Sequence, residues 1–242
     1  MADKTKFIEE LNAKYQPKGE YIVLGKGMLD GEVITEVDVN IPLKTINRHG
    51  LIAGATGTGK TKTLQVFVEQ LSHKGIPTLV MDIKGDLSGI AVEGEQNDKI
   101  NERYAKTKLP YQPQSFPVEL MTISAEKGLK LRATVTEFGP VLLSKILGLN
   151  DTQSSIMSIV FKYADDKGLP LIDLDDLKKT LQYVTDNDEG KKELASNYGA
   201  ISPASLGAIL RSIVAMEQQG ATSFFGEPSF DVEDLLQTRG GK

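Results

Sequence analysis

The chain has 242 residues, of which 40% are hydrophobic and 25% are charged, a composition typical of a globular protein. It contains no cysteine, which excludes disulfides, thiolate metal sites and a cysteine nucleophile, and its two histidines are too far apart in sequence to suggest a metal site. The net charge of −5 argues against nonspecific coating of nucleic acid, and no apolar stretch is long enough to span a membrane, so we expect a cytoplasmic protein without a membrane partner.

The first part of the chain predicts a helix and a small β element. Apolar residues recur at helical spacing over residues 5–15. Residues 21–24 and 32–39 are typical of short strands, because glycines and an Asp-Gly turn pair separate them. We expect residues 1–46 to form an element of their own in front of the main core.

Residues 47–138 predict the first part of an α/β core. The apolar run at 50–53 suits a buried parallel strand, and residues 61–74 place their apolar side chains on one face of a helix. A second apolar run follows at 78–83. A strand, a helix and a strand of these lengths form a βαβ unit, which implies a parallel sheet.

The rest of the chain predicts further strands and then helices. We expect an exposed connection at 94–115, which is polar and contains prolines, and strands at 118–123 and 131–135. Residues 139–222 have helical periodicity, so we expect a helical insertion in the core. Residues 223–242 then return toward the core.

Polar side chains mark three helix starts within the expected insertion. Asp151 can cap one helix, and Asp175 or Asp176 can start another. Ser202 can cap a third helix, with Pro203 at its first position.

A glycine-rich loop directly follows the apolar run at 50–53. Its eight residues match the pattern G-x-x-x-x-G-K-[ST] at every fixed position, between an expected strand and an expected helix. A strand can turn into a helix around a phosphate only through backbone conformations that side chains block, and Gly54, Gly57 and Gly59 allow them. The N–H groups of residues 57–61 then face an anion at the positive end of the helix.

Two side chains of the loop are suited to a nucleoside triphosphate. Lys60 can reach the β- and γ-phosphates and is the candidate catalytic cation, and the hydroxyl of Thr61 can bind Mg²⁺. Lys62 can add a backbone N–H. We therefore predict ATP and Mg²⁺ as cofactors. The predicted binding residues are Gly54, Ala55, Thr56, Gly57, Thr58, Gly59, Lys60, Thr61 and Lys62.

Asp82 lies at the end of the second apolar run, and ligands of open α/β sheets bind beyond such strand ends. One interpretation makes Asp82 a Mg²⁺ ligand through water, together with Thr61. A second, which we favour, gives Asp82 and Asp86 a supporting role, because no glutamate follows Asp82. A third is a strand-end turn at Lys84-Gly85-Asp86 without any chemistry.

Three segments of the chain resemble the HerA-like branch of the HerA–FtsK superfamily of P-loop ATPases. They are residues 47–61, 82–87 and 147–153, and the resemblance spans roughly residues 20–240. It implies a RecA/FtsK-like parallel sheet core and a homohexameric ring that hydrolyses ATP to translocate or unwind duplex DNA. It also implies a Walker B strand that ends in Asp-Glu, a polar sensor residue and an arginine finger.

The chain departs from this family pattern, because it has no run of four apolar residues followed by Asp-Glu. It stops at residues 239–242, which we interpret as a loop, and we expect a fragment or truncated product that keeps the nucleotide-binding loop. Without the glutamate, we expect it to bind ATP but to hydrolyse it slowly or not at all.

Two other function classes remain open. They are a nucleotide-binding module without catalysis and a small-molecule P-loop kinase. A GTPase is disfavoured, because the guanine-reading sequence Asn-Lys-x-Asp does not occur.

Overall fold

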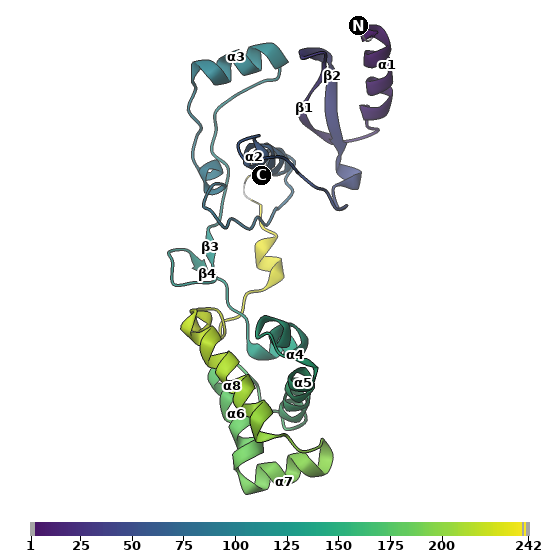
Figure 1. Cartoon of the computed structure of the whole chain (residues 1–242). Coiled ribbons are helices and arrows are strands. Elements are labelled where there is room, and N and C mark those ends of the chain that lie inside the picture. The colour runs from purple at the N-terminus through teal and green to yellow at the C-terminus, as the bar shows by residue number, and fades with distance from the viewer. Residues whose placement is uncertain (1–2, 239, 241–242) are drawn as a thin grey trace. The chain divides into compact units, whose positions relative to one another are not determined.

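The computed structural model describes residues 3–238 and 240, so most of the expected terminal loop at 239–242 lies outside the described residues. The chain divides into two compact units. Met1–Val118 together with Val232–Lys242 form the N-terminal unit, and Glu119–Asp231 form the helical unit. The fold class is mixed α/β, with two small sheets of two strands each in the described part of the chain (Figure 1).

The N-terminal unit starts with a helix and a β-hairpin (Figure 1). Helix α1 (Lys4–Tyr15) is capped by Asp3, whose carboxylate accepts a hydrogen bond from the Thr5 N–H at 3.0 Å. Strands β1 (Tyr21–Leu29) and β2 (Glu32–Pro42) pair antiparallel. The expected helix and strands are therefore confirmed, and both strands are longer than predicted.

The hairpin contributes a small apolar core. Ile22, Ile34 and Val37 are each at most 2% exposed. Helix α1 packs along β2, where the Asn12 side chain donates a hydrogen bond to the Glu36 carbonyl at 3.2 Å. The next helix in the chain packs against strand β1 of this hairpin.

Helix α2 (Lys60–His73) confirms the helix that was expected at 61–74. The side chain of Gln70 ties it to the hairpin. Its Oε1 accepts a hydrogen bond from the Val23 N–H at 2.7 Å, and its Nε2 donates to the Val23 carbonyl. The residues that α2 buries are Gln65, Val68 and Leu71.

The two apolar runs that flank α2 in the sequence form no strand. Residues 50–53 and 78–83 pair with no other strand in the described part of the chain. Leu51 is 89% exposed, Met81 84% and Ile83 95%. A short apolar run becomes a stable strand only when neighbouring strands complete its hydrogen bonds and cover its faces. The expected βαβ unit and P-loop NTPase sheet are therefore not confirmed.

Helix α3 (Asp98–Thr107) lies within the connection expected at 94–115, which is largely exposed as predicted but contains a helix that was not predicted. Asn97 caps it and accepts a hydrogen bond from the Ile100 N–H at 3.0 Å. None of its residues is fully buried, and its apolar side chains Ile100 and Tyr104, one turn apart, are partly buried. Short 3₁₀ turns lie at Leu43–Thr45, Ser88–Ala91, Ala221–Ser223 and Val232–Leu235.

The helical unit starts with a two-residue parallel pairing between β3 (Met121–Thr122) and β4 (Leu129–Lys130). Strand β3 falls within the strand that was expected at 118–123. The strand expected at 131–135 is wrong, because this segment forms only an isolated bridge at Ala133 before the next helix begins.

Helices make up the rest of this unit, as predicted for residues 139–222. They are α4 (Val135–Ile146), α5 (Asp151–Asp166), α6 (Leu174–Asp186), α7 (Asp188–Asn197) and α8 (Pro203–Gln218). Helix α4 starts before the predicted boundary, because its first turn precedes a break at Gly139, which has a φ of 77°. The short polar helix α7 was not predicted.

The helix caps agree in part with the predicted ones. Ser202 caps α8, as predicted, and accepts a hydrogen bond from the Ser205 N–H. Helix α5 is capped by Asn150 and not by Asp151. Helix α6 is capped by Asp173, and the predicted Asp175 and Asp176 lie in its first turn. In α5 and α6 a side chain three residues later bonds back to the cap N–H, which completes a capping box.

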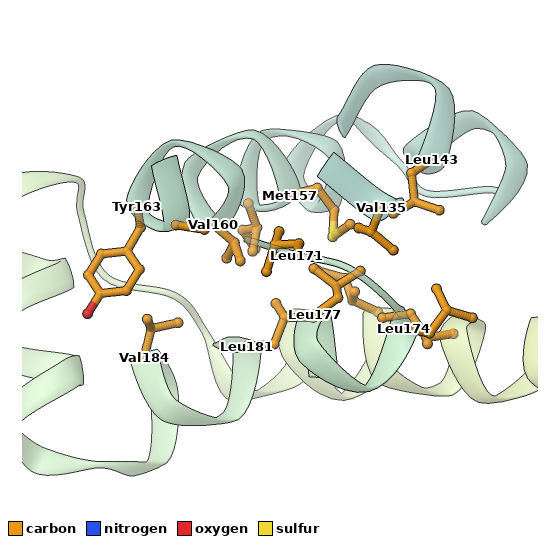
Figure 2. Packing of buried hydrophobic residues seen from close by; sticks show 14 of the residues in the cluster. Val135, Leu143, Met157, Val160, Tyr163, Leu171, Leu174, Leu177, Leu181 and Val184 are labelled. Carbon is orange, nitrogen blue, oxygen red and sulfur yellow. The ribbon is translucent and has the colours of Figure 1, made fainter. Parts of the chain in front are cut away.

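Helices α4 to α8 share one apolar core. Figure 2 shows side chains of α5 facing those of α6 across it. Met157, Val160, Leu177 and Leu181 have no exposed surface, and Ile209 of α8 is equally buried. None of the described helices is both long enough and apolar enough to cross a membrane.

The chain enters and leaves the helical unit along paired segments. The Ala133 N–H donates to the Phe224 carbonyl at 3.1 Å, and the Gly226 N–H donates to the Ala133 carbonyl at 3.0 Å. The Phe230 N–H donates to the Arg132 carbonyl at 2.9 Å. Segments far apart in sequence thus lie side by side where the chain enters and leaves the helical unit.

Candidate functional site

The glycine-rich loop, residues 54–61, lies largely exposed at the start of α2. Gly57 and Gly59 have φ angles of 81° and 95°, which side chains disfavour. A β-carbon at Gly54 would lie 2.5 Å from Oγ1 of Thr58. Each of the three predicted glycine positions therefore has a local physical reason to be glycine.

The carbonyl oxygen of Ala55 organises the loop. It accepts hydrogen bonds from the Thr58 N–H at 3.3 Å and from the Thr58 hydroxyl at 2.8 Å. The Lys60 ammonium donates to the same oxygen at 2.7 Å. The positive charge of Lys60 is therefore held against the loop backbone.

The first turn of α2 offers backbone donors to a ligand. The first N–H groups of an α-helix have no acceptor within the helix, and here they belong to Lys60, Thr61 and Lys62. Gly59 at the cap position has no side chain to accept from them, and the first turn contains no acidic residue. Such a helix end favours an anion.

Asp82 forms a tight turn with the residues that follow it. Its carboxylate accepts hydrogen bonds from the N–H groups of Asp86 at 3.1 Å, Leu87 at 2.8 Å and Ser88 at 3.3 Å. Burial raises the pKa of Asp82, but the surrounding backbone N–H groups outweigh it, and the pKa is lowered overall. The structure thus shows Asp82 holding a turn, and both of its predicted roles, support and Mg²⁺ contact, stay predictions.

Gln65, which the sequence did not single out, connects this turn to α2. It lies one helical turn after Thr61 and is 7% exposed. Its Nε2 donates a hydrogen bond to the Asp86 carbonyl at 2.8 Å. The structure thus ties the turn of Asp82 to the helix that carries Thr61. The available signal was a glutamine within the apolar face of α2, next to Leu64.

A surface hollow of about 850 Å³ lies in the helical unit, and none of the residues predicted to bind nucleotide lines it. Its charged groups neutralise one another. Glu193 accepts a hydrogen bond from the Tyr163 hydroxyl at 3.1 Å and forms an ion pair with Lys167. Lys167 lowers the pKa of Glu193, whereas burial and the bond to Glu193 raise the pKa of Tyr163. We interpret this cluster as a brace between α5 and α7.

Comparison with known proteins shows to which family this chain belongs. Residues 29–242 match the family described as helicase HerA-like C-terminal. The chain belongs to this HerA-like family. The HerA-like chain is also 35% identical over 78 residues to "Probable helicase MJ1565" of Methanocaldococcus jannaschii, a match that covers 31% of the chain and 15% of that relative. No solved structure matches it.

The loop of this HerA-like chain has features that fit a magnesium–nucleotide complex. Its glycines leave room for phosphates, and its cation and helix N–H groups suit their charge. Among the described residues, no group of three or more His, Asp or Glu side chains is placed to hold a metal alone. Mg²⁺ in nucleotide sites uses one or two protein oxygens plus phosphate oxygens, so Thr61 and Asp82 remain its predicted ligands.

Proposed function

We propose that the glycine-rich loop binds ATP with Mg²⁺ and that the complete protein is a HerA-type motor ATPase. The observation that carries the proposal is the loop itself. Left-handed glycines at 57 and 59 lead into a helix end without an acidic residue, and the ammonium of Lys60 lies over the same loop. Membership of the HerA-like family supports the motor part of the proposal.

In the proposal, ATP binding replaces the hydrogen-bond partner of the Lys60 ammonium. In the free loop the ammonium is bound to the Ala55 carbonyl. A triphosphate offers full negative charges in place of a carbonyl dipole, so the ammonium turns to the β- and γ-phosphates. The N–H groups at the start of α2 then bind phosphate oxygens, and Lys60 stabilises the charge that develops during phosphoryl transfer.

Mg²⁺ neutralises phosphate charge when it is bound. In the proposal the Thr61 hydroxyl holds the ion directly, and Asp82 holds it through water. The lowered pKa of Asp82 keeps its carboxylate ionised at neutral pH, which suits this role.

The proposal for the complete protein extends to a homohexameric ring that uses ATP hydrolysis to translocate or unwind duplex DNA. Its support is the family and the helicase name of the relative. The matched segment spans only 15% of that relative, so ring and DNA are assigned to the complete protein and not to this chain.

The second candidate is a nucleotide-binding module without catalysis. The observation that favours it is the lack of an apolar run ending in Asp-Glu in the sequence. Such a chain binds ATP through the loop but does not polarise a water molecule for attack.

Calorimetric titration with Mg·ATP tests the proposal. We expect binding by the wild-type chain and its loss in Lys60→Ala. Lys74→Ala removes the same charge at the other end of α2 and should bind as the wild type does. Equal heats for Lys60→Ala and the wild type would overturn the proposal, and tighter binding of Mg·GTP than of Mg·ATP would overturn the choice of nucleotide.

Turnover measurements separate the two candidates. Hydrolysis by the wild-type chain that disappears in Lys60→Ala supports the ATPase. ATP binding without measurable hydrolysis, in this chain and in the complete protein with duplex DNA, supports the binding module.

A further inference from the structure

Gln65 is a buried polar residue that the proposed function does not yet use. It is 7% exposed on a helix whose other buried residues are apolar. Residues four apart in a helix share one face, and side chains lean toward the helix N-terminus. Gln65 therefore lies on the face of α2 that carries Thr61 and leans toward it.

The partner of Gln65 is a turn that is closed by its own hydrogen bonds. The Asp82 carboxylate binds three consecutive N–H groups, those of residues 86–88. The Leu87 side chain between them is only 9% exposed. The Asp86 carbonyl of this turn accepts the hydrogen bond from Gln65. The side-chain amide of Gln65 thus links the face of α2 that carries Thr61 to the turn whose N–H groups bind the Asp82 carboxylate.

We propose that Gln65 is a positioning residue that holds the Asp82 turn against the Thr61 face of α2, so that Thr61 and Asp82 serve the same magnesium–nucleotide complex. The proposal rests on the proposed function of the loop. Gln65 acts through the turn and does not touch the nucleotide. Loss of the Gln65 amide therefore weakens the Mg²⁺-dependent part of ATP binding. It leaves unchanged the part that comes from contacts between the loop and the phosphates.

Gln65→Met tests the proposal, because methionine keeps the length of the side chain and removes the N–H donor. Gln70→Met is the matched control: it makes the same change on the same helix, but Gln70 binds the hairpin at Val23. Gln65→Glu, which keeps the volume and loses the donor, replaces Gln65→Met if the latter does not fold.

The first measurement is amide hydrogen exchange without nucleotide. We expect the N–H groups of residues 86–88 to exchange about tenfold faster in Gln65→Met, as the loss of one buried hydrogen bond implies, and to be unchanged in Gln70→Met. Unchanged exchange in Gln65→Met would overturn the link between Gln65 and the turn, whatever the loop binds.

The second measurement is ATP binding with and without Mg²⁺. We expect Gln65→Met to raise the Mg²⁺ concentration for half-maximal effect about fivefold to tenfold, with ATP affinity in EDTA unchanged. Asp82→Asn should give a shift at least as large, because it removes the carboxylate itself, and adding Gln65→Met to it should give no further shift. An equal loss of affinity with and without Mg²⁺ would overturn the positioning role.

The outcome for the wild-type chain separates the two proposals. If it binds no ATP, the proposed function and the role of Gln65 in it both fail. If it binds ATP and Gln65→Met keeps the wild-type Mg²⁺ dependence, only the role of Gln65 fails.

Discussion

The Lys60 ammonium and the Ala55 carbonyl oxygen are hydrogen-bonded at 2.7 Å, so the lysine of the loop binds the backbone of the same loop. The same oxygen accepts from Thr58, which makes it the centre of the loop. A phosphate that binds here competes for Lys60 but leaves the Thr58 bond in place. The loop therefore keeps its shape while its cation changes partner, which lowers the entropic cost of binding.

Thr58→Val should weaken ATP binding without unfolding the protein. Valine keeps the shape of threonine and removes the hydroxyl that donates to Ala55 at 2.8 Å. One lost hydrogen bond corresponds to a loss of affinity of about threefold to tenfold. Titration calorimetry measures it, and Thr63→Val, which removes a similar bond to Gly59 one turn into the helix, should have a smaller effect. Unchanged affinity in Thr58→Val would contradict the importance of this bond.

Gly54→Ala should have an effect similar to that of Thr58→Val or larger. The new β-carbon would lie 2.5 Å from Oγ1 of Thr58, so the hydroxyl has to leave Ala55. Gly50→Ala is the control, since no atom lies within 4 Å of its β-carbon. We expect ATP affinity to fall in Gly54→Ala and to stay at the wild-type value in Gly50→Ala. The prediction fails if the two variants bind ATP equally well.

Gln70→Met should destabilise the N-terminal unit and spare nucleotide binding. The substitution leaves the N–H and carbonyl of Val23 without their shared partner. We expect the free energy of unfolding to fall by about 1–3 kcal/mol, as measured by urea denaturation. Gln112→Met, which changes an exposed glutamine outside α2, gives the background effect of this type of change. A stability equal to that of the wild type would show that Gln70 does not hold the hairpin.

Asp173→Ala and Asp175→Ala should separate the true cap of α6 from its neighbour. The Asp173 carboxylate accepts a hydrogen bond from the Asp176 N–H at 3.0 Å, so its loss should cost about 1 kcal/mol. The exposed Asp175 forms an ion pair with Lys178, and its loss should cost less than the loss of the cap. Thermal unfolding followed by circular dichroism measures both, and the reverse order of stabilities would contradict the assignment.

The helical unit should lose stability in acid. Hydrogen bonds lower the folded-state pKa of Glu137, Asp166 and Glu193, chiefly those from Thr134, Lys162 and Lys167 respectively. A carboxylate whose pKa is lowered by folding contributes its full stabilisation at any pH above its unfolded-state pKa, which is 4.5 for the glutamates. This stabilisation is lost as the pH falls through the folded-state pKa. We expect a urea midpoint that is flat near neutral pH and falls below about pH 4.5.

A variant tests the cause of this acid dependence. Glu193→Gln removes the carboxylate that binds Lys167 and Tyr163, so its urea midpoint should fall less steeply in acid. Glu189→Gln makes the same charge change in α7 without touching that ion pair. The same acid dependence in wild type and Glu193→Gln would rule out this group as a contributor.

Local patterns of the sequence determined the glycine-rich loop, α2 and most helices of the helical unit. The motif at 54–61 specifies backbone conformations residue by residue, and the structure has left-handed glycines at Gly57 and Gly59. Ser202 likewise caps its helix because the side chain binds an N–H only three residues away. Such features depend on neighbours within one turn, so a sequence pattern is sufficient to predict them.

The tertiary structure alone decided which distant groups meet. Gln65 binds a carbonyl 21 residues away, Gln70 binds Val23 across 47 residues, and the base of the helical unit pairs segments from its two ends. The apolar runs at 50–53 and 78–83 read as strands, yet they form none in the described chain. A strand exists only through hydrogen bonds to a neighbour, and the residues of a run cannot specify whether that neighbour is present.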